Sequence, residues 1–304
     1  MARPEGRLTR MPGGNGHGEV LLFTQPPQRV VSLVPSMTES LFDLGLGASV
    51  VGVTDFCRPP EPRPSVGGTR APDLDRILAL APDLVIANQE ENSRPAVEKL
   101  RSAGLRCWLT FPRSTADAVQ VLWTLVELFR ASHAIPRLKT LEMTLEWTRS
   151  AAEAQSKLRV FVPIWTEAHP QAGPWWMSFN RQTYAHDVLA CCGGESVCAG
   201  RERRYPLAAD LGLELPESAG ERDVRYPRLL PAEVIDLQPE VILIPDEPYP
   251  FGESEIEQLA ALLDGTPAVR HGRVVRIQGA LLTWHGTRLA QALAELPSLL
   301  RPAA

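Results

Sequence analysis

The sequence lacks the patterns that mark several large classes of protein. Its five cysteines include no CxxC pair, so neither a disulfide framework nor a zinc site is indicated, and we expect buried, reduced thiols. No stretch approaches the roughly 18 apolar residues of a membrane span, which predicts no membrane insertion. The formal net charge of −5 leaves no basic excess to neutralise phosphates, which argues against nucleic acid as a partner.

Signatures of catalysis are absent from the sequence as well. There is no GxSxG elbow, no P-loop and no GxGxxG after a strand, and His169 and His186 lack the HExxH spacing of zinc hydrolases. The sequence therefore predicts a protein that is not an enzyme and requires no cofactor.

The first residues are rich in glycine and arginine, and the first apolar run is Val20–Phe23. This run is shorter than the roughly 7–15 apolar residues of a signal peptide. As it stands, the beginning predicts a flexible segment over 1–27 and a cytoplasmic protein. If the start codon lies further upstream, we expect a periplasmic or cell-surface protein instead.

From residue 28 onward, strands and helices alternate. Ser36 and Glu39 have the spacing of a capping box, so we expect the first helix to begin just after Ser36. The alternation is typical of a parallel sheet covered by helices and predicts an α/β lobe over 28–131. Strands are expected at 29–34, 50–53, 83–87 and 106–109, and helices at 37–44, 73–81 and 94–103.

A different pattern fills residues 115–157, which contain no glycine and one proline, Pro136. Apolar residues recur there at helical spacing, so two helices are expected, with Pro136 in the first turn of the second. We interpret 132–157 as one long helix that joins two lobes.

The α/β pattern then restarts and predicts a second lobe over 158–304, with a long loop at 199–230. Residues 74–86 and 231–243 share one order of features: an apolar helix, a proline, an acidic residue and a buried strand. This internal echo favours two related lobes. The predicted fold class is α/β, with two three-layer lobes built on parallel sheets, joined by one long helix, and with a ligand cleft between the lobes.

Several phrases of the sequence together resemble a known family. They are RVVSLVPSMTE (29–39), LGLG around Gly45, VGVTD (51–55), ALAPDLVI (79–86), CGGE (192–195) and WHGTRL (284–289). As a set they resemble the helical-backbone (class III) binding proteins of ABC importers, and they look closest to the vitamin B12-binding members. The resemblance covers about residues 28–300. It implies a bound cobalamin, haem or ferric chelate as the ligand.

The resemblance also implies an ABC permease as a partner, because an acidic residue on each lobe of such proteins docks on arginines of the permease. Asp75, seven residues before Pro82, matches this pattern. The equivalent position before Pro239 is Ala232, with Glu233 beside it. One residue along a helix turns a side chain by about 100°, so the Glu233 half of the docking pair departs from the pattern.

Candidate ligand-binding residues follow from the rule that ligands bind at the carboxyl ends of the strands in α/β sheets. Aromatic faces suit a planar ligand, and arginine forks suit carboxylate or phosphate groups. Asp246 and Glu247 could accept hydrogen bonds from amides or pair with Arg204. Core packing, a solvated loop or a plain turn is the alternative in each case. The candidates are Ser36, Asp55, Phe56, Cys57, Arg58, Asn88, Gln89, Trp165, Trp175, Phe179, Arg204, Tyr205, Asp246, Glu247, Tyr249, Trp284, His285 and Arg288.

No metal site is assigned from the sequence, but His285 and Cys57 are candidate axial ligands for a metal held in a macrocycle. A neutral imidazole can coordinate such a metal, and Arg58 could lower the pKa of the neighbouring Cys57 thiol. A structural role for both side chains is the alternative.

Three functions remain open at this point. The preferred hypothesis is a soluble, monomeric protein that binds a cobalamin-like ligand without catalysis. The second is the substrate-binding component of an ABC importer for cobalamin, a ferric siderophore or haem, with a start codon further upstream. The third is a cytoplasmic enzyme or accessory factor that acts on such a ligand through Cys57, Asp246, Glu247 and His285.

Overall fold

In the computed structural model, which describes residues 9–12 and 20–301, the chain divides into two compact units. Unit 1 comprises residues 1–142 and 285–288, and unit 2 comprises residues 143–284 and 289–304. The chain therefore crosses from one unit to the other at 142/143, 284/285 and 288/289.

The predicted flexible segment 1–27 is described only in part. Its described residues include an antiparallel pair of strands, β1 (Thr9–Pro12) and β2 (Val20–Phe23). The rest of the segment, residues 1–8 and 13–19, lies outside the described residues.

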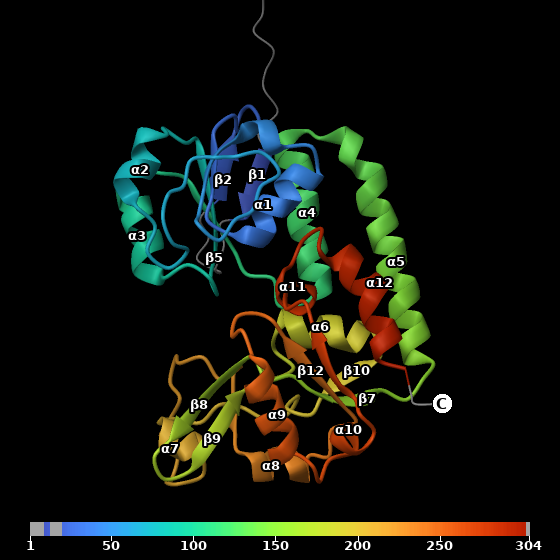
Figure 1. Cartoon of the computed structure of the whole chain (residues 1–304). Helices are drawn as coiled ribbons and strands as arrows, with labels where there is room; N and C mark the ends of the chain where they lie inside the picture. The colour runs from blue at the N-terminus through green and yellow to red at the C-terminus, as the bar shows by residue number, and fades with distance from the viewer. Residues whose placement is uncertain (1–8, 13–19, 302–304) are drawn as a thin grey trace, which may run out of the picture. The chain divides into compact units, whose positions relative to one another are not determined.

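Unit 1 contains a parallel sheet between two layers of helices. The strand order is β4-β3-β5-β6, and all neighbours are parallel. Figure 1 shows α2 and α3 on one side of this sheet and α1 and α4 on the other. The elements are β3 (Val30–Ser32), α1 (Pro35–Asp43), η1 (Gly47–Ser49), β4 (Val50–Val53), α2 (Leu74–Ala79), β5 (Leu84–Asn88), α3 (Arg94–Ser102), β6 (Cys107–Thr110) and α4 (Thr115–Phe129).

Alternation of side chains along the strands builds the core of unit 1. Val31 of β3 and Val85 of β5 are fully buried and pack with Ile77 of α2 and Leu100 of α3. Burying a side chain of this size stabilises the fold by roughly 1.5–3 kcal/mol. The sheet is thereby fixed to α2 and α3, and its strand ends have defined positions.

Helix α1 begins earlier than the capping box predicted, and that prediction was wrong. The helix starts at Pro35, its N-cap residue is Val34, and no side chain caps it. Proline suits this place, because its fixed φ matches the helix and its missing N–H would have no helical partner. Ser36 therefore lies inside the helix and is 1% exposed.

The two helices predicted over 115–157 are present, separated by the turn η2 (Ser132–Ala134). The second helix, α5 (Ile135–Glu153), carries Pro136 in its first turn, where the missing N–H costs nothing. The boundary between the units falls within α5, at 142/143. Helix α5 therefore contains the first of the three crossings between the units.

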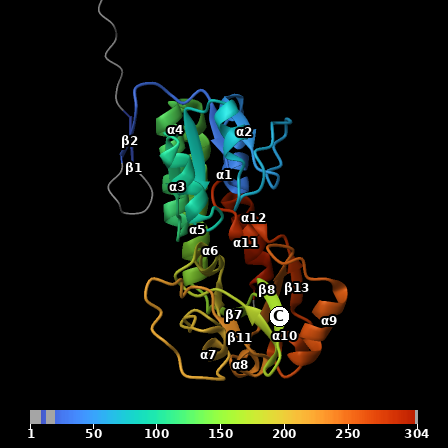
Figure 2. The ribbon, with the colours of Figure 1, turned by 90° about the vertical axis from the view of Figure 1, so that its left-hand side faces the viewer.

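Unit 2 contains a second parallel sheet of order β10-β7-β12-β13. Figures 1 and 2 agree that α6, α11 and α12 lie on one side of these strands and α8, α9 and α10 on the other. The elements are β7 (Leu158–Phe161), α6 (Tyr184–Cys191), β10 (Gly194–Ser196), α7 (Leu207–Asp210), α8 (Pro231–Asp236), β12 (Val241–Pro245), α9 (Glu253–Leu262), α10 (Pro267–Arg270), β13 (Val274–Ile277), α11 (Ala280–Thr283) and α12 (Leu289–Leu299).

A small antiparallel sheet in unit 2 does not follow from the sequence pattern. It consists of β8 (Trp165–His169), β9 (Gly173–Met177) and β11 (Arg228–Leu229), in the order β11-β9-β8. β11 lies within the stretch 199–230 that predicted only a loop, and α7 (Leu207–Asp210) lies there too. A two-residue strand is too short to produce a detectable alternation.

The internal echo between 74–86 and 231–243 extends to backbone geometry. Ala81 and Gln238, each directly before a proline, have positive φ values of 42° and 45°. The acidic residues after the prolines have matching roles: Asp83 accepts a hydrogen bond from Arg29 N at 3.1 Å, and Glu240 accepts one from the N–H of the corresponding arginine of unit 2 at 2.9 Å.

Matching arginines complete this echo. The Arg29 guanidinium donates to Leu80 O at the end of α2, and the Arg159 guanidinium donates to Leu237 O at the end of α8. Each arginine thus satisfies a helix-terminal carbonyl that has no partner inside its helix. The two units share one structural repeat.

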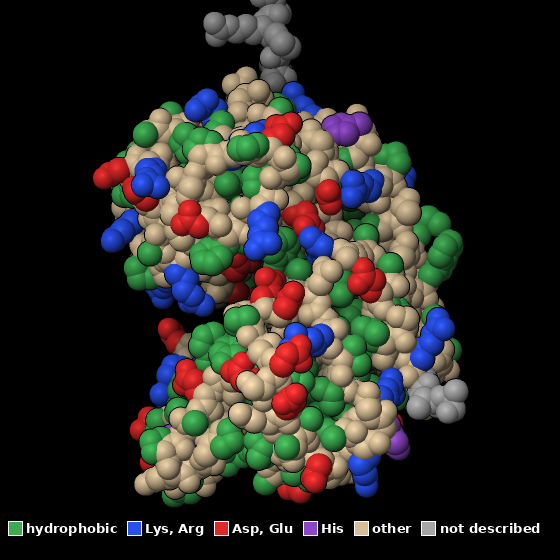
Figure 3. All heavy atoms as spheres, in the orientation of Figure 1, with side chains coloured by type: hydrophobic (Ala, Val, Ile, Leu, Met, Phe, Trp, Pro, Cys, Tyr) green, Lys and Arg blue, Asp and Glu red, His purple; other side chains and the backbone are tan. Residues whose placement is uncertain are grey.

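All five cysteines are buried, as predicted. Within the described residues, no helix is both long and apolar enough to span a membrane. On the face drawn in Figure 3, Lys and Arg side chains are interspersed with Asp and Glu.

Candidate functional site

The carboxyl ends of the strands in unit 1 hold a buried cluster of polar side chains. Asn88, the last residue of β5, is 2% exposed. Its Nδ2 lies 3.3 Å from Thr110 Oγ1 and 3.2 Å from His285 Nε2. Because an amide nitrogen donates, His285 Nε2 accepts, which places the imidazole proton on Nδ1.

His285 is 5% exposed, and burial lowers its pKa to about 4. The ring is therefore neutral at pH 7. Its Nε2 also lies 3.5 Å from Ser36 Oγ. The predicted axial ligand is thus a neutral histidine, and its Nε2 is occupied by the donor Asn88.

Cys57, the other candidate axial ligand, lies among hydroxyl groups. Its Sγ accepts a hydrogen bond from Thr38 Oγ1 at 3.2 Å and is 3.2 Å from Thr54 Oγ1. Burial raises the pKa of the thiol, so Cys57 is protonated at pH 7. The expectation that Arg58 lowers this pKa was wrong, because the Arg58 side chain is exposed and burial of the thiol dominates.

Four predicted residues of unit 1 lie in exposed loops at the strand ends. Asp55, Phe56 and Arg58 follow β4, and Gln89 follows β5. Phe56 is 63% exposed. The Asp55 carboxylate accepts a hydrogen bond from the Ser65 hydroxyl. These are the members of the unit 1 set that a ligand could reach without moving a buried side chain.

Residues 285–288 come late in the sequence but belong to unit 1. Thr287 N donates to Ser40 Oγ at 3.1 Å, and the Arg288 guanidinium pairs with Glu39. Arg288 is thus engaged with helix α1. Sequence spacing gave no signal for this placement, because the partners lie more than 240 positions apart.

Aromatic side chains gather at the strand ends of unit 2. The rings of Trp165 and Tyr249 pack edge-to-face with their centroids 5.3 Å apart, and the centroids of Tyr249 and Phe251 are 4.8 Å apart. Trp165 follows the end of β7, and Tyr249 follows the end of β12, so the strand-end rule brings them together. Trp165 and Tyr249 are half-buried, so part of each ring is exposed to solvent.

Other predicted aromatics of unit 2 lie deeper. Trp175 is 4% exposed and lies beneath the Arg228 guanidinium, and Phe179 is 1% exposed. Trp284 is half-buried, and its carbonyl oxygen accepts a hydrogen bond from Tyr184.

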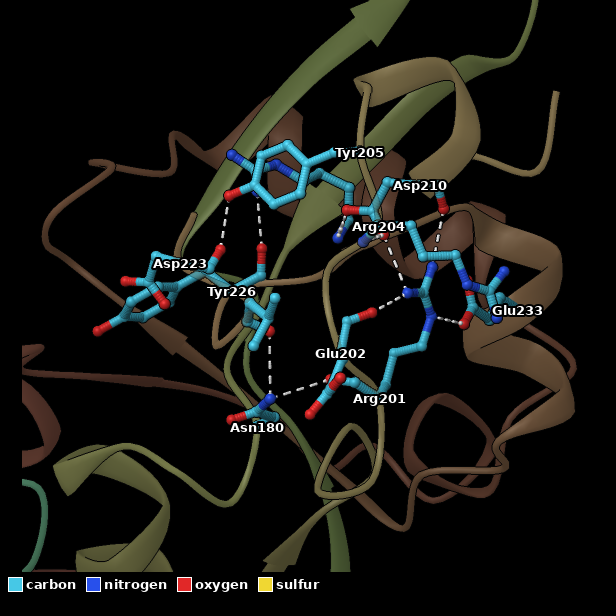
Figure 4. Close-up of polar contacts among 11 residues, drawn as sticks. Asn180, Arg201, Glu202, Arg204, Tyr205, Asp210, Asp223, Tyr226 and Glu233 are labelled. Carbon is cyan, nitrogen blue, oxygen red and sulfur yellow. Dashed lines mark hydrogen bonds and ion pairs between the residues drawn. The ribbon is translucent and has the colours of Figure 1, made fainter. Parts of the chain in front are cut away.

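The arginine-rich segment contains one well-paired arginine. Figure 4 shows the Arg201 guanidinium between Asp210, at 2.9 Å, and Glu233, at 2.8 Å. Tyr205 is 9% exposed, and its hydroxyl donates to Asp223 O at 2.6 Å. Arg204 is exposed, and its backbone N–H donates to Asp210.

The acidic pair at the end of β12 makes contacts within unit 2. Asp246 Oδ1 accepts a hydrogen bond from Gly279 N at 2.7 Å. Glu247 Oε1 accepts one from Thr283 Oγ1 at 3.3 Å. Both carboxylates therefore have partners in the loop and helix that follow β13.

The two candidate docking residues differ in exposure. Asp75 is the second residue of α2 and is exposed. Ala232, the second residue of α8, is exposed at the equivalent position, whereas Glu233 is half-buried and paired with Arg201.

Two arginines are absent from the list of candidate ligand contacts: Arg203, which belongs to the arginine-rich run 201–206, and Arg228. Both are half-buried, and Arg228 lies in β11, which the sequence did not predict. Their only signal was the high local density of arginine. Among the described residues, no group of three or more His, Cys, Asp or Glu side chains is placed to hold a metal ion.

Two α/β units with parallel sheets, one joining helix and aromatic and polar strand ends define a class of two-unit ligand-binding proteins. Comparison with known proteins agrees. Residues 30–124 match the family described as periplasmic binding protein. The vitamin B12-binding protein of Salmonella choleraesuis is 31% identical over 203 residues, which cover 62% of this chain and 68% of that protein. That of Pectobacterium carotovorum is 25% identical over 228 residues, covering 73% and 72%. The chain belongs to this family of B12- and iron-type periplasmic binding proteins.

Solved structures show the same fold. The apo form of the periplasmic haem-binding protein RhuT from Roseiflexus has a TM-score of 0.65 at 23% identity, covering 90% of this chain and 97% of RhuT. The periplasmic vitamin B12-binding protein BtuF of Vibrio cholerae has a TM-score of 0.65 at 20% identity, covering 90% and 96%. The predicted α/β fold is confirmed.

The comparisons also bear on the three functions that the sequence left open. The relatives are binding proteins, which confirms ligand binding and favours the importer hypothesis over the preferred free-standing binder. The expected cytoplasmic location finds no support, because the matched proteins are described as periplasmic.

Proposed function

We propose that this protein captures a cobalamin-like corrinoid, or a related macrocyclic metal complex, as the periplasmic substrate-binding component of an ABC importer. The observation that carries the proposal is the 31% identity to the vitamin B12-binding protein of Salmonella choleraesuis. The protein acts as a monomer, requires no cofactor and releases its ligand unchanged.

Contacts to the ligand come from the exposed and half-buried side chains at the strand ends. In unit 1 these are Phe56, Arg58 and Gln89, and in unit 2 they are Trp165 and Tyr249. Aromatic faces bury a large area at a small cost in side-chain entropy and suit the flat face of a macrocycle.

A binding role, without chemistry on the ligand, is supported by the state of the reactive groups. The raised pKa of Cys57 keeps it a thiol, and the lowered pKa of His285 keeps it neutral and hydrogen-bonded to Asn88. Asp246 accepts a backbone N–H. None of these groups is set up as an activated nucleophile or base, which requires an adjacent activating partner.

Docking on the permease would depend on Asp75 of unit 1. Its carboxylate is exposed in the first turn of α2. The equivalent position in unit 2 holds Ala232, and Glu233 is engaged with Arg201. In the proposed docking contact, therefore, only unit 1 supplies an exposed carboxylate at the equivalent position.

Titration of the purified protein with cyanocobalamin, haemin and a ferric siderophore tests the ligand proposal. The seven tryptophans provide the signal, and we expect saturable quenching at micromolar or lower cyanocobalamin. Trp165→Ala should weaken binding by about tenfold, which is roughly 1.4 kcal/mol. Trp147→Phe is the control, because Trp147 is 69% exposed on α5. Absence of quenching by all three compounds, or recovery of a chemically altered ligand, would contradict the proposal.

A further inference from the structure

Among the residues that the structure describes, two arginines of unit 2 form no ion pair with an Asp or Glu side chain. Arg203 and Arg228 are half-buried, and the Nε of each is buried without a hydrogen-bond partner among the described residues. Their neighbours in sequence behave differently: Arg201, Arg222 and Arg225 each pair with an Asp or Glu. In the part of the chain that the structure describes, neither Arg203 nor Arg228 forms such an ion pair.

The fold brings the two arginines together, because the backbone N–H groups of Arg204, the residue after Arg203, and of Arg228 donate to the two carboxylate oxygens of Asp210, each at 2.9 Å. Burial and, next to it, the positive charge of Arg203 lower the pKa of Arg228. Half-buried like charges repel with little screening, and desolvation adds to the cost. An anion bound between the two guanidinium groups would remove both penalties.

Aromatic rings hold both guanidinium groups in place, and the Arg228 guanidinium also donates a hydrogen bond to Tyr226 O at 2.7 Å. Arg203 stacks on the Tyr205 ring at 4.2 Å, and Arg222 lies over the same ring at 4.1 Å. Arg228 lies over the Trp175 ring at 5.9 Å. The Tyr205 hydroxyl is fixed by Asp223 O (Figure 4). Guanidinium groups held in this way lose little further freedom when they bind.

The sheet register places Arg228 on the same face as a predicted ligand contact. Arg228 is opposite Met177 of β9, and Met177 is opposite Trp165 of β8. Directly opposed residues share a face of a sheet. The alternate residues Trp176 and Leu229 pack in the core of unit 2, so the face with Trp165 and Arg228 is the outer one.

We infer that Arg203 and Arg228 bind an oxyanion, a carboxylate or phosphate group, and that it is the acidic edge of the ligand whose flat face meets Trp165. The second half of this inference rests on the proposed function. Guanidinium groups bind such oxygens through paired, charge-assisted hydrogen bonds. Neither residue was among the sequence-derived candidates, and the pair gives the site a preference for acidic over neutral ligands.

The first experiment tests the oxyanion site alone, with inorganic phosphate as the probe. We expect saturable binding, followed by tryptophan fluorescence because Trp175 lies under Arg228. Arg203→Gln and Arg228→Gln should each weaken it by about tenfold. Arg270→Gln, an exposed arginine of unit 2, should leave it unchanged. If phosphate does not bind, or if the Gln variants bind it as well as the unmodified protein, the site is refuted.

The second experiment asks whether the anion belongs to the ligand. Haemin is compared with its dimethyl ester, and cyanocobalamin with dicyanocobinamide, which lacks the phosphate. In each pair that binds, the acidic member should bind about tenfold more tightly. The difference should vanish in the double Gln variant. Equal affinities, with phosphate still bound, would assign the site to a free anion and overturn the second half of the inference.

Two further measurements keep these outcomes interpretable. Circular dichroism melting shows whether each Gln variant is folded, and Arg203→Lys with Arg228→Lys keeps the charge but removes the fork. The Lys variant should retain part of the phosphate affinity. If no macrocycle binds at all, the proposed function fails, while the phosphate titration still decides the oxyanion site.

Discussion

A neutral, buried histidine links residues that are far apart in the sequence of unit 1. His285 accepts a hydrogen bond from Asn88 and lies beside Ser36, so the loop 285–288 is held against the ends of β5 and α1. Protonation of His285 would convert this acceptor into a donor facing the Asn88 donor, in a buried setting. The hydrogen bond that holds the loop 285–288 therefore forms only while the imidazole is neutral.

The first prediction concerns the dependence of stability on pH. The pKa of His285 is about 4 in the fold, below its ordinary value of 6.5. Between these values the unfolded chain binds a proton that the folded chain does not, so the contribution of His285 is complete above pH 6.5 and is lost as the pH falls toward 4. From pH 7 to pH 4.5, His285 should cost about 2–3 kcal/mol of the free energy of unfolding.

Urea unfolding of the unmodified protein and of His285→Gln measures this difference. Glutamine can still accept from Asn88 but does not titrate, so the variant should lose less stability between the two pH values. Identical losses in both proteins would show that His285 titrates normally in the fold.

For single residues, the sequence predicted which side chains lie at strand ends better than it predicted which of them are buried. It selected Trp165 and Tyr249 at strand ends, and their rings are in contact at 5.3 Å. It also selected Trp175 as a ligand contact, but Trp175 is only 4% exposed. Trp175 is buried because Arg228 of β11, about fifty positions further along the chain, covers its ring. Burial of one residue by another so distant leaves no local pattern to detect.

At the element scale, the loop 285–288 depends on one glycine. Gly286 has a φ of 96°, and a Cβ built there would overlap the Ser40 hydroxyl. Both the positive φ and the close approach require glycine. Ser40 Oγ also accepts a hydrogen bond from Thr287 N, so the same hydroxyl joins helix α1 to this loop.

The second prediction separates these two requirements. Gly272 also has a positive φ, 64°, but no atom lies within 4 Å of its built Cβ. Gly272→Ala should therefore cost about 1–2 kcal/mol for backbone strain alone. Gly286→Ala should cost more, by about 1–3 kcal/mol for the overlap. Chemical denaturation measures both, and equal losses would mean that Ser40 moves aside freely.

The third prediction uses the structural repeat. Arg29 and Arg159 each donate to a carbonyl at the end of a helix, α2 in unit 1 and α8 in unit 2. Replacing either by Met should cost about 1 kcal/mol, as for a hydrogen bond to a charged group at a solvent-exposed site. Hydrogen exchange should rise in α2 and β5 for Arg29→Met, and in α8 and β12 for Arg159→Met. Exchange spread evenly over the chain would contradict local capping.

Elements with a strong period were predictable, and the others were not. The strand predicted at 50–53 coincides with β4, because buried parallel strands are continuous apolar runs. The sheet of β8, β9 and β11 was missed, since its hydrogen bonds join segments with no periodicity of their own. The capping box failed because Pro35 begins the helix earlier.

For the whole molecule, the fold could be predicted because a repeated unit on each side of one long helix is a pattern of the entire chain. The ligand-binding residues are harder to predict from the sequence, because Arg203 and Arg228 stand out only through the absence of an ion pair with Asp or Glu among the described residues. Charge balance in a folded unit is a property of the neighbours in space.

The last prediction concerns the stability of the whole molecule in the presence of its ligand. A ligand that binds only the folded state stabilises it by RT ln(1 + [L]/Kd), which is about 2.7 kcal/mol at a hundredfold excess over Kd. For a chain of this size the melting temperature should rise by roughly 4–5 °C. Cyanocobalamin should produce this rise in the unmodified protein and a smaller one in Trp165→Ala at the same concentration, while Trp147→Phe should match the unmodified protein. After melting, mass spectrometry should recover cyanocobalamin unchanged, because the proposed role is binding without chemistry on the ligand. If the melting temperature does not change with cyanocobalamin but rises with haemin, the protein is a binding protein whose ligand is haem and not cobalamin.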